Sequence, residues 1–137
     1  EMITLETTIK WAAAVGGGIA SFLFGGWSTS LQTLLIFVAL DYLTGVVAAG
    51  KEGRLSSNVG LIGIAKKVMI FFVVAVAHQV DILLGDGHVF RDAAATFYIA
   101  NEAISILENA GRIGIPIPEK IYQAIEVLKG REKNKNG

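Results

Sequence analysis

The residues of this chain best suited to chemistry are polar side chains set inside apolar segments. Asp41 lies near the centre of an apolar block, and Thr44 follows about one helical turn later. A carboxylate at the middle of a bilayer costs at least about 2.5–3.5 kcal/mol on the insertion scale, so it should face protein or water. We expect Asp41 and Thr44 to face a pore or to link protomers. The alternative is a static acid bonded to a neighbouring helix.

A polar stripe occupies a later and less apolar segment. The main row is spaced by four, three and four residues and consists of Asn101, Ser105, Glu108 and Arg112. A flanking row beside it consists of Glu102 and Asn109, seven residues apart. This spacing places them on one side of a helix. In a membrane the stripe must turn into a bundle or a wet lumen. We expect it to form part of a switchable pore surface, the alternative being a permanently hydrogen-bonded interior.

Metal and catalytic sites are not predicted. His78 and Asp81 are three residues apart and could ligate a metal or relay a proton, but two ligands do not complete a site. We expect them to form a solvated pair near the outer end of their helix. The chain has no cysteine, and Gly16–Gly18 follows no strand and lacks the lysine of a phosphate loop. We therefore predict no cofactor and no enzymatic activity.

The composition points to lipid as the solvent. Of 137 residues, 53% are hydrophobic and only 18% are charged, and the mean hydropathy is +0.55. Soluble domains carry about 25% charged residues. Twelve basic residues balance twelve acidic ones, so no net positive field exists to attract nucleic acid, and we predict no nucleic-acid partner.

Four apolar blocks approach the length of a bilayer: 9–26, 31–49, 64–84 and 91–110. At about 1.5 Å per residue each block spans most of the ~30 Å hydrocarbon core. None shows the alternation of a barrel strand, and helices satisfy their own backbone in lipid. We predict an all-α integral membrane protein with four transmembrane helices. A three-helix version, in which 9–26 does not cross, is the alternative.

The chain divides into two parts after the last block. Residues 1–114 form the predicted transmembrane domain, and 115–137 the predicted cytoplasmic part. Pro116 ends the last long helix. Apolar residues then recur at helical spacing from Ile117 to Leu128, which predicts an amphipathic helix on the membrane surface. The residues after Gly130 are expected to form a solvated, unstructured tail.

Basic residues predict the orientation. With four crossings, every lysine and arginine except Arg91 falls on one side. Because such an excess marks the cytoplasmic face, both termini should be cytoplasmic. Lys66 and Lys67 precede the third apolar run and are expected to anchor it at the interface, where they can meet anionic lipid headgroups.

Small residues recur every four positions in the first block, at Ala13, Gly17, Ser21 and Gly25. Such a face lets two helix backbones approach closely in lipid. We expect an oligomerisation face that binds a second copy of the chain. Packing within one protomer is the equally weighted alternative.

Two segments are distinctive: DYLTG at 41–45 and YIANEAISILENAGRIGIPIPEKI at 98–121. Between them lie Ser56-Ser57, Gly60, Gly63, Lys66-Lys67, His78 and Asp81. The pattern, which extends from about residue 31 to 129, resembles the phage lysis holins of Gram-positive hosts. That family includes holin-like proteins associated with toxin secretion.

The resemblance implies a small phage- or prophage-encoded protein of the bacterial cytoplasmic membrane. Such proteins accumulate as homo-oligomers and open lesions that release an endolysin, or a toxin, and lead to host cell lysis. Direct binding of endolysin is not required, and an antiholin is a candidate partner. The competing hypothesis is a small ion channel or transporter subunit that uses Asp41, Glu102 and Glu108 as an acidic pathway.

Overall fold

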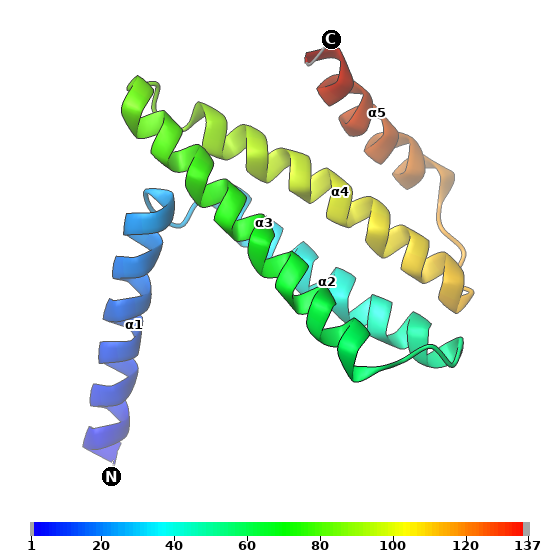
Figure 1. Ribbon diagram of the computed structural model, residues 1–137, viewed down its shortest axis with the longest axis horizontal. Coiled ribbons are helices and arrows are strands. Elements are labelled where there is room, and N and C mark those ends of the chain that lie inside the picture. Colours follow the sequence, from blue (N-terminus) through cyan, green and yellow to red (C-terminus); the bar gives the residue numbers. More distant parts are fainter. Residues whose placement is uncertain (1, 136–137) are drawn as a thin grey trace.

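The computed structural model describes residues 2–135, and this part of the chain is built from helices without a strand. They are α1 (Met2–Phe24), α2 (Thr29–Lys51), α3 (Ser57–Leu84), α4 (Val89–Ile113) and α5 (Glu119–Lys135). The all-α prediction is confirmed. Helices α2, α3 and α4 form a bundle, from which α1 and α5 diverge (Figure 1).

Helix ends follow the local sequence. The hydroxyl oxygens of Ser28 and Ser56 accept hydrogen bonds from the N–H groups of Leu31 and Val59, at the starts of α2 and α3. These bonds satisfy donors that a helix start leaves unpaired. Gly85 and Gly114 end α3 and α4 in the left-handed region, with φ of +67° and +101°, a conformation that glycine adopts without a Cβ penalty.

The most extensive packing in the bundle joins α2 and α4, and α3 packs on α4. A small apolar core of Leu31, Leu34, Val74 and Ala95 is fully buried near one end. By contrast, most large apolar side chains are exposed, including Phe72, which is 55% exposed on α3. An apolar surface of this extent fits a protein surrounded by hydrocarbon rather than by water.

Three helical segments are long and apolar enough to cross a membrane: Thr4–Phe24, Thr29–Lys51 and Ser57–Leu84. Of the four predicted crossings, the one that does not meet this criterion is α4, whose polar stripe lowers its hydropathy. The three-helix alternative had instead omitted the first block. A fourth crossing by α4 therefore stays a prediction. Because α4 packs against α2 and α3, its polar side chains can face those helices instead of lipid.

Three boundaries differ from the prediction. Helix α1 begins at Met2, seven residues before the expected start. Helix α3 begins at Ser57, seven residues before the expected start, because Ser56 caps it and no proline interrupts 57–63. At about 1.5 Å per residue, α3 is ~42 Å long and exceeds the ~30 Å hydrocarbon core. Helix α5 continues past Gly130 to Lys135, where an unstructured tail was expected; the last two residues lie outside the described part.

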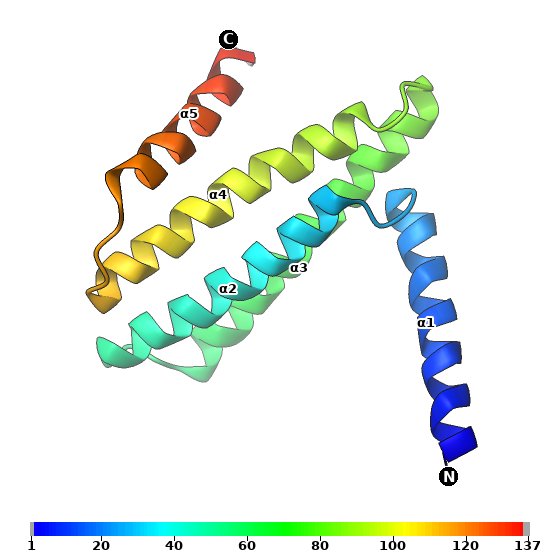
Figure 2. The ribbon, with the colours of Figure 1, turned by 180° about the vertical axis from the view of Figure 1, so that it is seen from behind.

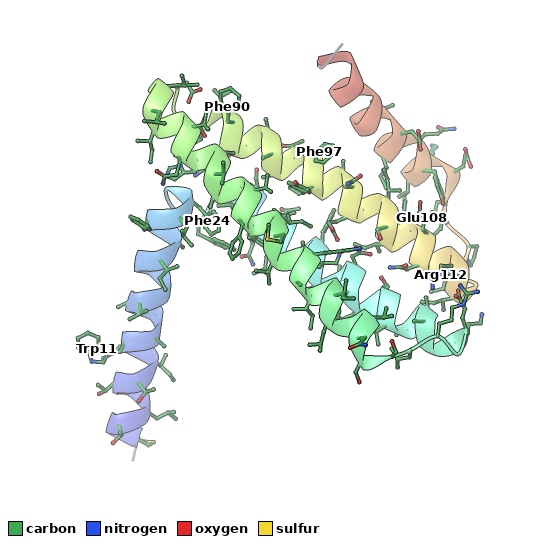
Figure 3. The ribbon with its side chains drawn as sticks, viewed as in Figure 1. Trp11, Phe24, Phe90, Phe97, Glu108 and Arg112 are labelled. Carbon is green, nitrogen blue, oxygen red and sulfur yellow. The ribbon has the colours of Figure 1, made fainter. Side chains whose placement is uncertain are left out.

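Helix α1 joins the bundle only at its carboxyl end. Phe24 is buried and makes edge-to-face contacts with Trp27 and Phe71. Figure 3 shows Phe24 directed at the bundle and Trp11 projecting away from it. The reverse view shows α1 leaving the bundle as a separate rod (Figure 2).

Candidate functional site

Three charged side chains, one from each helix of the bundle, meet in its interior. The Lys67 ammonium group of α3 forms ion pairs with Asp41 of α2 and Glu102 of α4, the latter at 2.8 Å. The side chains of Asp41 and Glu102 are each only 7% exposed, and that of Lys67 is 20% exposed. We call these three residues the charge network. Pairing is what allows carboxylates to remain in such a dry position.

Asn109 extends the charge network along α4. Its Nδ2 lies 2.9 Å from Asp41 Oδ1, 3.2 Å from the Asp41 carbonyl oxygen and 3.0 Å from Thr44 Oγ1. The Thr44 hydroxyl in turn donates to the Leu40 carbonyl oxygen. These bonds tie α2 to α4 at the height of the charge network, and an amide buried in this way has its donors satisfied.

Glycines let α2 and α3 approach beside the charge network. The Tyr42 hydroxyl lies 3.5 Å from the Gly60 carbonyl oxygen. A Cβ placed at Gly60 would come 3.3 Å from that hydroxyl, and one at Gly63 would come 3.6 Å from the ring. A side chain at position 60 would therefore press on Tyr42, whereas a Cβ at position 63 would make an ordinary van der Waals contact with its ring.

Exposed polar contacts hold together the end of the bundle where the α2–α3 loop meets the end of α4. Arg112 donates to both carboxylate oxygens of Glu52, at 2.8 and 3.1 Å, and Lys51 donates to the Ile113 carbonyl oxygen. The Arg112 guanidinium lowers the pKa of Glu52 below its usual value, mainly by hydrogen bonding. Arg112 also reaches Asn109 Oδ1 at 3.3 Å, which connects this contact to the charge network.

The polar stripe of α4 is rotated relative to its prediction. The flanking residues Glu102 and Asn109 are the buried ones, and Ser105 is half-buried. Asn101 and Glu108, placed in the main row, are exposed. Figure 3 labels Glu108 and Arg112 on the carboxyl half of α4. The spacing identified the polar positions of α4. Which of them face inward depends on the positions of α2 and α3, and the spacing carries no information about those positions.

Only three of the four residues of the predicted small-residue face lie in α1, because the helix ends at Phe24. Ala13, Gly17 and Ser21 are exposed, and a Cβ at Gly17 would meet nothing within 4 Å. No neighbour within the described protomer covers this part of the face. Gly25 does not belong to the helix: it lies in the following turn at φ +70°, against His78 and His88.

Lys66 and Lys67, both predicted to anchor the helix at the membrane interface, have different surroundings in the structure. Lys66 is exposed, as an interfacial side chain would be, and its role stays a prediction. Lys67 instead turns inward to Asp41 and Glu102. Because α3 begins at Ser57, Lys67 lies about 15 Å into the helix rather than at its start.

The prediction of a solvated His78–Asp81 pair is wrong, because both side chains are buried at the end of the bundle where a turn joins α3 to α4. Asp81 is buried, and its two oxygens accept hydrogen bonds from the backbone N–H groups of Phe90 and Arg91, at 2.8 and 2.9 Å. It thereby caps α4 from another helix, since His88 forms no capping hydrogen bond through its side chain. Arg91 is also buried and donates to the Phe24 carbonyl oxygen at 2.8 Å.

Long apolar helices, a lipid-facing surface and an internally paired charge network together define an integral membrane protein of the helical-bundle class. Comparison with known proteins then gives the family. The bacteriophage holin family matches residues 18–130 of the chain. The chain therefore belongs to the bacteriophage holin family.

Individual relatives agree with this assignment. A probable holin of Bacillus phage phi105 is 35% identical over 105 residues, covering 77% of this chain and 78% of the phage protein. An uncharacterized protein of Halalkalibacterium halodurans is 50% identical over 133 residues, covering 93% and 98% of the two chains. An uncharacterized 14.9 kDa protein of the nagH 3' region of Clostridium perfringens is 48% identical, covering 90% and 95%. No solved structure matches the chain.

Proposed function

We propose that this chain oligomerises in the bacterial cytoplasmic membrane and opens lesions that release an endolysin or a toxin. The observation that carries the proposal is α1: a helix of spanning length whose small-residue face is exposed in the protomer. In lipid, helices associate through close packing at such faces because no hydrophobic force drives them together. A second copy of the chain is the partner that supplies a matching face.

The bundle supports the proposal in a different way. Its charge network is paired internally, so a single protomer can reside in lipid before assembly. Asn101 and Glu108 of α4 are exposed, however, and both would be poorly solvated by hydrocarbon. We propose that they face water or another protomer once lesions form. This arrangement requires no catalytic group.

The orientation is part of the proposal. The α1–α2 turn and the α3–α4 turn lie at one end of the bundle, where Gly25 abuts His88, and the α2–α3 loop and the end of α4 meet at the other. We propose that the second end is cytoplasmic, with both termini. Because the chain has no cysteine, single cysteines can be introduced at Asp86 and at Arg54 and tested with a membrane-impermeant maleimide in intact cells. We expect the Asp86→Cys variant to be labelled and the Arg54→Cys variant not to be. Labelling of the Arg54→Cys variant alone would reverse the orientation.

Expression in a bacterium tests the function. We expect an abrupt loss of membrane potential after the protein accumulates, and lysis only when a cytoplasmic endolysin is coexpressed. A matched culture that expresses Gly17→Leu should keep its potential longer. Cells that tolerate high membrane levels with their potential intact would contradict the proposal. An antiholin, if present, would copurify with the protein and delay the loss of potential.

The ion-channel alternative receives less support from the site. Asp41 and Glu102 share the Lys67 ammonium group, and Glu108 is exposed elsewhere on α4, so the three acids do not line a continuous path. A channel predicts a selective, graded conductance in planar bilayers. Release of a folded endolysin across the membrane excludes it.

A further inference from the structure

The outer end of the bundle holds three side chains that could ligate a metal ion. They are His78 and Asp81 of α3 and His88 at the start of α4, and we call them the outer cluster. One ligand atom from each lies within 4.8 Å of the other two. The two imidazole rings are stacked, with centroids 5.9 Å apart. Sequence reasoning had counted two ligands, because His88 lies ten residues from His78.

The turn between α3 and α4 brings the third ligand into place. His78 and Asp81 share a face of α3 since they are three residues apart. Gly85 and Gly87 then adopt positive φ, +67° and +77°, and reverse the chain within a few residues. His88 thus returns to the same face from the next helix.

A buried atom in the outer cluster lacks a partner. His78 is only 6% exposed, and its Nδ1 has no hydrogen bond within the described structure. Buried ring nitrogens are normally paired, so an orphan of this kind calls for an explanation such as a bound ion. Asp86, in the same turn, has a buried oxygen, Oδ1, that receives no hydrogen bond from a donor in the described structure, and its carboxyl group lies against that of Asp81. The orphaned nitrogen of His78 and a second buried polar atom therefore occur beside one set of candidate ligands.

The acid of the outer cluster is already held in position. Both oxygens of Asp81 accept backbone N–H groups of α4, and each oxygen keeps a second lone pair for a cation. Hydrogen bonds that fix a ligating side chain are a regular feature of metal sites. We propose that the outer cluster binds a divalent transition-metal ion of the zinc class through His78, Asp81 and His88. Two imidazoles with one carboxylate form a ligand set that suits zinc and its neighbours.

The site would also touch the attachment of α1. A Cβ built at Gly25 would overlap Cε1 of His78 and lie 3.0 Å from Cε1 of His88. The α1–α2 turn therefore lies directly against both imidazoles. An ion held there would fix the rings and so define the surface on which α1 is seated. This inference does not depend on lesion formation.

Metal binding to the purified full-length chain tests the proposal. The protein is prepared in detergent with an affinity tag that contains no histidine, and Co²⁺ alone is titrated. We expect one ion per chain, visible absorption bands of nitrogen and oxygen coordination, and displacement by Zn²⁺. His78→Gln and His88→Gln should each weaken binding at least about tenfold, since even outer-shell changes cost ~10–100-fold. Asp92→Asn, an exposed acid on α4, serves as the matched control and should bind normally.

A second measurement does not require that the variant at the buried residue His78 folds. The chain has two histidines, so the imidazole region of its NMR spectrum contains two ring systems, and Zn²⁺ should shift both. His88 is exposed, and His88→Gln should retain its helical circular dichroism. Absence of Co²⁺ binding to the parent chain, or equal binding by the parent and His88→Gln, would overturn the proposal.

Discussion

Helix α1 and the bundle both belong to the apolar part of the chain, yet they are stabilised differently. The bundle buries two carboxylates and an amide and partly buries a lysine, and these groups hold three helices together. Helix α1 contacts the bundle only at its carboxyl end, where Arg91 donates to the Phe24 carbonyl oxygen and Ala20, Leu23 and Phe24 pack on the core. Its other described side chains are exposed. The difference indicates that contacts within one protomer determine the arrangement of the bundle, whereas the position of α1 depends on the lipid or protein around it.

The largest expected effect breaks the bundle. Lys67→Met leaves Asp41 and Glu102 buried without a counter-ion, and we expect a loss of about 3–5 kcal/mol in the free energy of unfolding. Unfolding in mixed detergent micelles measures it. Lys66→Met, the exposed neighbour, is the control and should change stability by less than about 0.5 kcal/mol. Equal losses for the two variants would mean that the charge network does not stabilise the bundle.

A milder change keeps the shape of the charge network. Asp41→Asn retains an oxygen for Asn109 but removes the charge facing Lys67, which still pairs with Glu102. We expect a loss of about 1.5–3 kcal/mol, the value of a charged hydrogen bond. The timing or size of lesions should also change, as followed by culture density and by release of proteins of graded size. Lysis curves identical to those of the parent would count against a role for this charge.

The third prediction concerns α1 alone. Gly17→Leu fills the exposed small-residue face without touching the bundle, so the protomer should unfold as before while its self-association weakens by about tenfold, or ~1.4 kcal/mol. Chemical crosslinking in membranes measures association. Val15→Leu, which adds bulk on another face of the same helix, is the control. An unchanged crosslinking ladder for Gly17→Leu would place the interface elsewhere.

The smallest expected effect concerns the contact between Arg112 at the end of α4 and Glu52 in the α2–α3 loop. Arg112 lowers the pKa of Glu52, so this contact stabilises the fold at pH values above the ordinary glutamate pKa of about 4.3. The contribution is lost as the pH falls through the lower folded-state pKa. The unfolding midpoint of Glu52→Gln should therefore lie below that of the parent at pH 7, and the two should converge in acid. A gap that stays constant at low pH would exclude ionisation as its cause.

Local sequence was enough to place most helices. Apolar blocks and glycine-containing turns gave α1, α2 and α4 to within a few residues, apart from the amino end of α1, because helix length and capping depend on neighbours in the chain. The start of α3 was missed since Gly60, Gly63 and the lysine pair interrupt its apolar run. The close approach of the Tyr42 hydroxyl explains why a glycine lies inside the helix at position 60.

The site was only partly predictable for a related reason. Asp41 and Glu102 could be identified as costly in lipid from their own segments. That Lys67 pairs with both depends on residues 26 and 35 positions away. The same holds for His88, whose place beside His78 follows from two positive-φ glycines in a turn. Periodicity describes one helix at a time and does not specify the rotation of its neighbours.

The single attachment of α1 has a mechanical consequence. Twenty-three residues make a lever about 35 Å long, and its pivot is the short turn that begins at Gly25. A tilt of roughly 20° at that pivot moves the far tip by about 12 Å for a lever of this length. In the proposed oligomer, neighbouring subunits can then stand at different spacings while every bond inside their bundles is preserved.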